Sequence, residues 1–379
     1  MYIWFTGSIG ASRCFIEGIH QLILRDKNKM MVGIHIDPDG SPDKTLLRYE
    51  KILEFNGIKY IRLNVNQPDF WRQVEKLDLF IFEWYWTSRQ HQMAPTILSL
   101  VENEMNVKCF PNLKTWWTYD DKIREYYLLE HHSFPVIPTW IFWDETFALK
   151  WLEDAELPVV FKLKSGAGSE NVVLVKTKSH AELLIHKMFG KGIASGCVPG
   201  TLDLRINDLG YLKTIRRYLG DRLRSLQLKN VSPFEQKHKN YAFFQKYLSG
   251  NTFDVRITTV GNRTFGSIRY MRKNDFRASG SGRDGWEKKD VDLRCVEIGH
   301  RVSKKLEFQS MAYDLLFDNE NKPYISEISY TSPDWSVWMS PGYWDNNLEW
   351  HDGQLWPQYC VLMDLLNLPD LKQPAMNRQ

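Results

Sequence analysis

Apolar and polar positions along the first 110 residues predict strands separated by helices. Short apolar runs typical of buried strands occur at 30–37 (MMVGIHID), 58–65 (IKYIRLNV), 77–86 (LDLFIFEWYW) and 106–110 (NVKCF). Helical spacing is found near 43–56 and 68–76, and the opening YIWFTGSIGAS predicts a strand, a glycine turn and a helix over roughly 12–25. This alternation indicates a parallel α/β layer of the Rossmann type.

The glycine-bearing tract GSIGAS (7–12) is not a standard phosphate loop. It lacks the GK[ST] ending of a Walker loop and the spacing GxGxxG. A purely structural turn and a turn whose N–H groups contact a ligand both stay open.

The pattern after residue 110 changes to mixed helices and strands. Thr118, followed by Asp121, predicts a helix start, and that helix should run to about His132 before a strand at TWIFW (139–143). Further helices are expected at 179–189 and 292–307, and strands dominate from 241 onward, with hairpins at 252–272 and 311–330. The basic stretch KTIRRYLGDRLR (213–224) is best interpreted as a solvated helix face, because it carries too little charge for a nucleic-acid surface.

The composition is that of an ordinary soluble globular protein. The chain has 379 residues, 43% hydrophobic and 25% charged, with a net charge of +3, so it has no bulk attraction to nucleic acid or membranes. No signal peptide or membrane-spanning run is evident. The five cysteines are scattered and form no CxxC pair, which favours a reduced, cytoplasmic protein.

A glycine-rich loop at FKLKSGAGSENVVLV (161–175) is the first chemical signal. Walker and Rossmann loops lead into a helix, whereas this loop leads into a β-branched run, which predicts a loop between antiparallel strands. Such a loop can cover phosphates with its backbone N–H groups, while Lys162 supplies a fixed charge. Protein kinases and ATP-grasp ligases both use this arrangement, but the chain contains no HRD, DFG or APE motif of a kinase.

Further motifs follow in a fixed order: NLKTWWTYDDK, VVFKLKSGAGS, FFQKYLSGNTFDVR, MRKNDFRASGSG and YDLLFDNENKPYISEIS. Over about residues 108–335 this order resembles the ATP-grasp carboxylate–amine ligases, such as glutathione synthetase and the ribosomal-protein glutamate ligases. The resemblance implies a mixed α/β ATP-grasp fold. It would comprise a Rossmann-like pre-ATP-grasp domain (1–108), a subdomain with the phosphate-covering loop (109–240), and a subdomain with the metal site and a Trp-rich extension (241–379).

Asp314 and Glu327 are the strongest metal candidates. They stand on two strands predicted to pair, among apolar neighbours, where uncompensated carboxylates would be costly. Carboxylate oxygens suit Mg²⁺, and Mn²⁺ is an alternative. The family has Asn two residues after the Glu, where this chain has Ser329, so one or two metal ions remain open.

The resemblance also implies the ATP contacts. Lys122 and Lys162 would bind the α and β phosphates, with Lys164 as a competing candidate for Lys162. The loop residues Ser165, Gly166 and Gly168 would cover the phosphates. The hinge would present the backbone of Gln245 and Lys246 to adenine and pack Leu248 on the ring, while Asp254 would contact the ribose or hold Arg256.

Catalytic roles implied by the resemblance fall on Arg256, Arg277 and Asn274, with Arg272 equally open to being a surface ion pair. ATP would phosphorylate a carboxylate, and an amine would attack the acyl phosphate to give an amide. Guanidinium groups suit the charge that develops on the transferred phosphate. A small-molecule kinase and a non-catalytic nucleotide-binding module are the alternatives.

The tail at 332–359 is rich in Trp, which indicates either a cover on the core or an acceptor pocket in which Trp335, Trp338 or Trp344 stacks on a sugar. The expected partners are a small carboxylate, such as a sugar acid or amino acid, and an amine, with no nucleic acid and no membrane. A homo-oligomer stays open, because the family includes dimers and tetramers.

Overall fold

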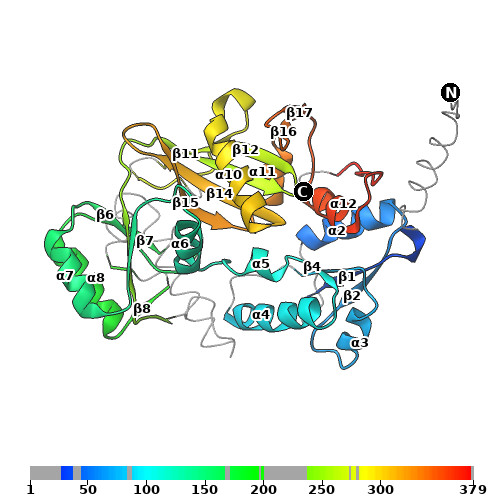
Figure 1. The fold of residues 1–379 in the computed structure, drawn as a ribbon, viewed down its shortest axis with the longest axis horizontal. Coiled ribbons are helices and arrows are strands. Elements are labelled where there is room, and N and C mark those ends of the chain that lie inside the picture. Colours follow the sequence, from blue (N-terminus) through cyan, green and yellow to red (C-terminus); the bar gives the residue numbers. More distant parts are fainter. Residues whose placement is uncertain are drawn as a thin grey trace, which may run out of the picture. The chain divides into compact units, whose positions relative to one another are not determined.

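The computed structural model describes residues 27–36, 44–82, 88–166, 171–195, 198–199, 237–272, 275–278 and 281–376 (Figure 1). The chain divides into two compact units, one of residues 1–83, 101–110 and 356–379, the other of residues 84–100 and 111–355. The predicted turn at 7–12, the helices at 12–25 and 213–224, and the site candidates Gly168 and Asn274 lie outside the described residues.

The first unit contains the expected parallel sheet. Its strands are ordered β2 (Lys59–Leu63), β1 (Met31–His35), β3 (Leu79–Ile81) and β4 (Lys108–Phe110), and every neighbouring pair is parallel. This confirms the parallel layer that the apolar runs predicted. Such runs are typical of parallel strands, because strands inside a parallel sheet are buried on both faces. Helices α2 (Lys44–Phe55), α3 (Phe70–Val74) and α12 (Pro357–Leu366) belong to the same unit, with α12 packed on α2.

Several described helices were not predicted from the sequence. Besides α12, they include α4 (Ser88–Asn103), which contains Pro95, and α7 (Glu145–Asp154). Asp144 caps α7, since its Oδ1 accepts the N–H groups of Thr146 and Phe147. The cap signal is short, and the internal proline of α4 argues locally against a helix, so the pattern around each gave no clear expectation.

The second unit holds a smaller antiparallel sheet ordered β5 (Thr139–Phe142), β10 (Ala242–Lys246), β6 (Val159–Lys162) and β7 (Val172–Val175). The pairing of β6 with β7 confirms the predicted hairpin. Helices α7 and α8 (Lys178–Phe189) pack against each other, and α8 also contacts β10 and β7 (Figure 1). A short pair, β8 (Ile193–Ala194) and β9 (Lys237–His238), lies in the same unit.

The larger sheet of the second unit is ordered β15 (Pro323–Ser329), β14 (Ser310–Phe317), β11 (Phe253–Val260), β12 (Arg263–Tyr270), β16 (Gly342–Trp344) and β17 (Trp350–Asp352). The short strand β13 (Asp284–Gly285) also pairs with β12. Helix α10 (Leu293–Leu306) packs on one face, where Gly299 permits close approach, since a Cβ there would lie 2.6 Å from Ile257. The strand period then directs Asp254, Arg256 and Asp314 to the opposite face.

Helix α6 (Lys122–His131) begins later than predicted. Asp121 is its N-cap, with Oδ1 accepting the N–H groups of Ile123 and Arg124, and Asp120 has a positive φ of 51°. The predicted start at Thr118 is therefore wrong, because the left-handed residue Asp120 separates it from the helix. Short elements α5 (Leu113–Trp116), η1 (Lys27–Lys29), η3 (Lys288–Asp290) and α11 (Asp334–Trp338) complete the described fold.

Among the described residues, none of the helices is both long enough and apolar enough to cross a membrane.

Candidate functional site

Four charged side chains form a continuous ion-pair ladder on the face of the large sheet opposite α10. Asp254 and Arg269 are opposite each other across β11 and β12, and Arg256 is opposite Asp314 across β11 and β14. Arg269 donates to both carboxylate oxygens of Asp254 at 2.8 and 2.6 Å, and its Nη2 lies 2.7 Å from Asp314. Arg256 donates to Asp314 at 2.8 and 3.0 Å.

This ladder corrects one sequence expectation. Asp254 does not hold Arg256: it holds Arg269, and Arg256 is held by Asp314. Register is the reason, because directly opposed residues on paired strands lie closer than neighbours on one strand that are two apart. Burial would raise the pKa of Asp314, but Arg256 and Arg269 outweigh it and hold that pKa far below its usual range.

Lys122, the first residue of α6, connects three parts of the site. Its Nζ lies 3.1 Å from Oε1 of Glu327 on β15 and donates to the carbonyl of Gly166 at 3.1 Å. The side chain is buried, which would lower its pKa, but the carboxylates of Glu327, Glu125 and Asp120 raise the pKa above its usual value. Lys122 is therefore a fixed positive charge between the loop and the β14–β15 hairpin.

The two lysines of the loop strand have different surroundings. Lys162 is buried and lines a cavity, with its Nζ 3.5 Å from the carbonyl of Ser326, and burial lowers its pKa to about 8. Lys164 is more exposed, and its Nζ lies 3.4 Å from Asp121. The structure thus brings Lys162 rather than Lys164 to the cavity.

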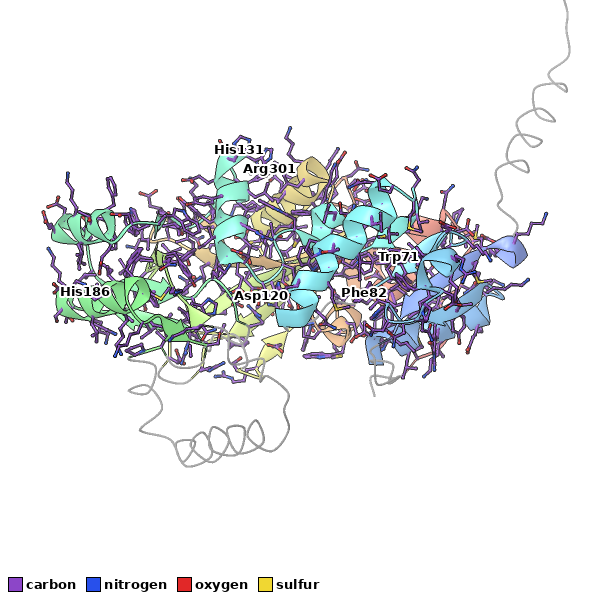
Figure 2. All side chains as sticks on the ribbon, turned by 90° about the horizontal axis from the view of Figure 1, so that it is seen from below. Trp71, Phe82, Asp120, His131, His186 and Arg301 are labelled. Carbon is purple, nitrogen blue, oxygen red and sulfur yellow. The ribbon has the colours of Figure 1, made fainter. Side chains whose placement is uncertain are left out.

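The start of the glycine-rich loop is held by side chains on both sides. Gly166 has a φ of 117°, and its N–H donates to Oδ1 of Asp120 at 2.6 Å. The carbonyl of Ser165 accepts from Nδ2 of Asn171 at 2.8 Å. Figure 2 shows Asp120 at the N-terminal end of α6, opposite His131. This end of the helix therefore lies against the loop that is expected to cover phosphates.

A cavity of about 90 Å³ collects many of the predicted residues. Those lining it are Lys162, Gln245, Lys246, Leu248, Asp254, Arg277, Asp314 and Glu327. Its apolar wall includes Met271, Phe276 and Leu316, a surface suited to a flat ring. Pockets for small molecules have volumes of roughly 300–1,000 Å³, so a nucleotide needs this cavity to widen.

Arg277 and Arg272 lie at one side of the site. Arg277 is buried, lines the cavity and is gripped by Asp275, with Nη2 to Oδ2 at 2.6 Å. The carbonyl of Arg277 accepts from the N–H of Arg272 at 3.1 Å. Arg272 does not line the cavity, so its side chain is not brought together with the other predicted residues.

The predicted metal ligands are only partly brought together. Asp314 and Glu327 are directly opposite on β14 and β15, and both line the cavity. Ser329 is two residues further along β15, but its hydroxyl donates to the carbonyl of Thr331 at 2.9 Å and the cavity does not include it. The two adjacent carboxylates fit a hard divalent cation, which prefers oxygen ligands.

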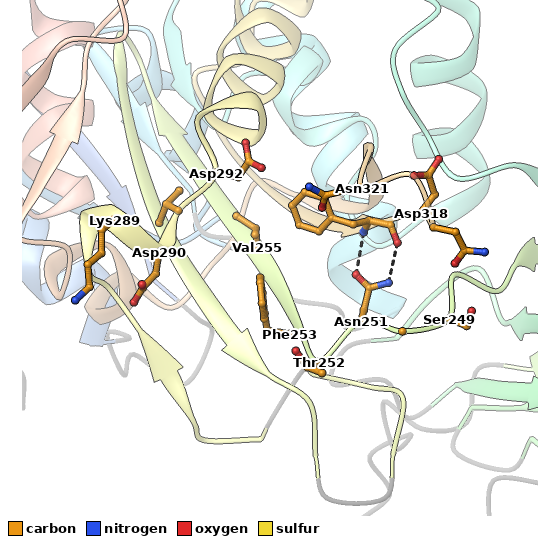
Figure 3. A pocket seen from close by; sticks show the side chains of 14 residues that line it. Ser249, Asn251, Thr252, Phe253, Val255, Lys289, Asp290, Asp292, Asp318 and Asn321 are labelled. Carbon is orange, nitrogen blue, oxygen red and sulfur yellow. Dashed lines mark hydrogen bonds between the residues drawn. The ribbon is translucent and has the colours of Figure 1, made fainter.

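A larger cavity of about 590 Å³ lies on the α10 side of the sheet (Figure 3). Phe253, Val255 and Phe317 contribute to its walls, together with the segment leading into α10. Asn251 lines both cavities and bonds to the N–H and carbonyl of Phe317 at 2.9 and 2.8 Å. None of the predicted site residues that the structure describes lines this second cavity.

Of the three tail tryptophans considered as ring platforms, one is buried and serves packing. Trp344 is 1% exposed and packs edge-on against Trp350, with ring centroids 4.6 Å apart. Stacking of a sugar on Trp344 is therefore ruled out. Trp335 packs against Trp286 at 6.0 Å, and both it and Trp338 are partly exposed.

Three residues near the site were missed by sequence reasoning: Glu125, Arg269 and Asp275. Arg269 pairs with the predicted residue Asp314, and Asp275 pairs with Arg277. Glu125 bonds the backbone of β15, the strand that carries Glu327. Burial and the Glu327 carboxylate raise the pKa of Glu125 well above its usual range. Glu125 follows Lys122 by three residues, so the helix period places both side chains on the same face of α6. This spacing is the one sequence signal that could have identified Glu125.

No protein-family model matches the sequence, and no curated protein matches it. Many solved structures resemble the fold, and three of them serve as examples. They are N5-carboxyaminoimidazole synthase from Aspergillus clavatus in complex with ADP and 5-aminoimidazole ribonucleotide (10% identity, TM-score 0.55, 92% of this chain and 79% of that one), D-cycloserine synthetase DcsG (15%, 0.53, 88% and 99%) and N5-carboxyaminoimidazole ribonucleotide synthetase from Thermotoga maritima (11%, 0.51, 90% and 76%).

These likenesses confirm the fold expected from the sequence motifs. The chain has the mixed α/β ATP-grasp fold.

Proposed function

We propose that this protein is an ATP-dependent carboxylate–amine ligase that forms an amide through an acyl-phosphate intermediate. The observation that carries the proposal is the convergence of Lys162, Asp314 and Glu327 with the hinge residues Gln245–Leu248 in one cavity. Cationic side chains, paired carboxylates and an apolar slot are the three elements that ATP needs. The synthetase names of the solved structures with this fold support the same class.

In this proposal Lys122 and Lys162 neutralise the phosphates of ATP, and Leu248 and Leu316 pack on adenine. Arg256, Arg269 and Arg277 face the transferred phosphate, where planar guanidinium groups offset the growing charge. Asn274 holds the acyl phosphate. Nucleophilic side chains are not required. The substrate carboxylate attacks the γ-phosphorus of ATP and releases ADP, and the amine then attacks the acyl carbon and releases phosphate.

Asp314 and Glu327 would hold Mg²⁺, which would supply neutralisation of phosphate charge when bound. Mn²⁺ can replace it at oxygen ligands of this kind. Ser329 would contribute through water rather than directly, since its hydroxyl is engaged by Thr331.

The substrates we propose are a small carboxylate, such as an amino acid or a sugar acid, and an amine. Trp335 and Trp338 are the candidates for an aromatic platform for such a ligand, because both are partly exposed.

The test is release of ADP from Mg²⁺–ATP with pools of amino acids and sugar acids, with and without hydroxylamine, which traps acyl phosphates as hydroxamates. ADP release with hydroxamate supports the ligase and identifies the acid. ADP release with a stable phosphorylated product instead indicates a kinase on the same fold. ATP binding without turnover in any pool indicates a non-catalytic module.

A further inference from the structure

Glu125 is a buried carboxylate on α6 with a backbone partner on β15. It is 4% exposed, and its Oε2 accepts the N–H of Ile328 at 3.0 Å. Ile328 directly follows Glu327, the residue proposed to bind the metal. Burial of an acid is costly unless a specific hydrogen bond compensates it, so this contact needs an explanation.

The position of β15 in the sheet supplies that explanation. β15 is the edge strand, paired with β14 on one side only. Its outer edge is bonded at Ile325, through Pro135 and Ile137, and again at Ile328, through Glu125. A buried edge N–H without a partner would be unfavourable, and here a side chain of α6 replaces the missing strand.

A second contact joins the same two elements one residue away. Lys122, one turn before Glu125 on α6, lies 3.1 Å from Oε1 of Glu327. Two neighbouring positions of β15 are therefore tied to two positions on one face of α6. The Glu125 contact holds the backbone N–H of Ile328, and the Lys122 contact is to the Glu327 carboxylate, which lines the cavity.

We infer that Glu125 is a positioning residue that fixes the backbone at Glu327, so that the Glu327 carboxylate is presented to the metal and the phosphates of ATP. This inference rests on the proposed function. Glu125 acts through its reach to the Ile328 N–H, and not through its charge or by filling space.

Three variants separate these roles. Glu125→Gln keeps an oxygen acceptor at the same reach and removes the ionisable carboxyl group. Glu125→Asp keeps a carboxyl group and withdraws it by about 1.5 Å, one carbon–carbon bond. Glu125→Leu keeps the volume and removes the acceptor. Glu130→Gln is the matched control, because Glu130 is exposed on the same helix and its side chain accepts a hydrogen bond from the Tyr126 hydroxyl rather than from β15.

The measurement is calorimetric binding of ADP with and without Mg²⁺, together with kcat and the Mg²⁺ dependence of turnover where turnover is found. Circular dichroism and thermal unfolding confirm that each variant is folded. We expect E125Q and E130Q to keep the Mg²⁺ enhancement of ADP affinity within about threefold of wild type. We expect E125D and E125L to lose about tenfold, the usual effect of removing a group that orients a metal ligand.

The outcomes are distinct. Wild-type enhancement in all variants, or a loss in E125Q with retention in E125D, overturns the inference and leaves the proposed function intact. Absence of ADP binding by the wild-type protein overturns the proposed function and the inference with it. If E125L does not fold, the pair E125Q and E125D decides the question alone.

Discussion

The guanidinium of Arg269 lies 2.7 Å from the carboxylate of Asp314 while also gripping Asp254. Arg269 therefore pairs with one buried acid and one half-buried acid on the same face of the sheet. The residue was not selected from the sequence, yet together with Arg256 it holds the proposed metal ligand Asp314. Arginine suits this task because its fork can bond two carboxylates at once.

Replacing Glu327 with Gln should reduce turnover more than nucleotide affinity. The amide keeps the shape but lacks the charge that the proposed metal site needs. We expect kcat to fall by about 10²–10³, the scale for loss of one group that stabilises transition-state charge, while Kd for ATP changes less than about tenfold. Steady-state ADP release and calorimetry measure the two. Glu320→Gln, exposed in the same β14–β15 hairpin, is the control. Equal losses in affinity and turnover would contradict the assignment.

Replacing Arg269 with Met should destabilise the fold. The change leaves Asp254 without its cation and removes one of the two cations that hold Asp314, and breaking a buried pair costs about 3–5 kcal/mol. Urea unfolding measures the free energy. Arg301→Met, at an exposed arginine of α10 (labelled in Figure 2), should cost less than about 1 kcal/mol. Adding Asp254→Asn to Arg269→Met should recover part of the loss, and a double variant no more stable than the single one would argue against this ladder.

Stability should respond to pH through Lys162. Burial lowers its pKa to about 8, below the value of 10.5 in the unfolded chain. Between these values the unfolded state binds more protons, so the contribution of Lys162 to the free energy of unfolding rises with pH. Below about pH 8 the amine is charged in both states, and the cost of burying it is fully present.

The measurement for Lys162 is the free energy of unfolding of the wild type minus that of Lys162→Met, followed across this pH window. Subtraction removes other groups that titrate there. The difference should rise with pH, and Lys164→Met, at the more exposed lysine beside Asp121, is the control. A difference that stays constant with pH would contradict the lowered pKa of Lys162 in the folded protein.

Replacing Gly166 with Ala should weaken nucleotide binding. Gly166 has a φ of 117°, and an added Cβ would lie 2.2 Å from Nδ2 of Asn171, which bonds Ser165. We expect ATP affinity to fall by about tenfold, the effect of losing one hydrogen bond of roughly 1.4 kcal/mol.

Gly57→Ala is the matched control for Gly166→Ala. Gly57 also has a positive φ, of 68°, but nothing lies within 4 Å of its added Cβ. Both variants carry a backbone cost of about 1–2 kcal/mol, so both should show reduced stability. Only the Gly166 variant should show reduced ATP affinity, and an equal loss in both would indicate that the loop has no special part in binding.

Much of the fold was predictable because its signals are local. Apolar runs gave the parallel sheet, and a β-branched run after the glycine-rich loop gave the β6–β7 hairpin. Helix α7 was missed because only its cap at Asp144 distinguishes it, and α4 because Pro95 lies inside it. Caps and single prolines are weak signals when tertiary packing stabilises a helix.

For the candidate site, the sequence predicted individual charged residues but not which residues contact one another. Lys162, Asp314 and Glu327 stood out because charges in apolar strands need a function or a partner. Their partners did not stand out, since Arg269 resembles any other strand arginine until the register of β11, β12 and β14 places it between two acids. Lys162 was preferred from the sequence and Lys164, on the same strand face, stayed a competing candidate until the structure brought only Lys162 to the cavity.

The sequence by itself determined the longer strands and the residue types that reach the sheet face, because periodicity and burial are properties of short stretches. The short strands β16 and β17 of the Trp-rich tail were not predicted. Tertiary structure decided which of those residues meet. Asp254 binds Arg269 rather than Arg256. Trp344 is buried in the fold and cannot serve as a ligand platform, and Glu125 bonds the edge of β15. The reason is that contacts between distant segments depend on strand register and helix placement, which no single stretch of sequence contains.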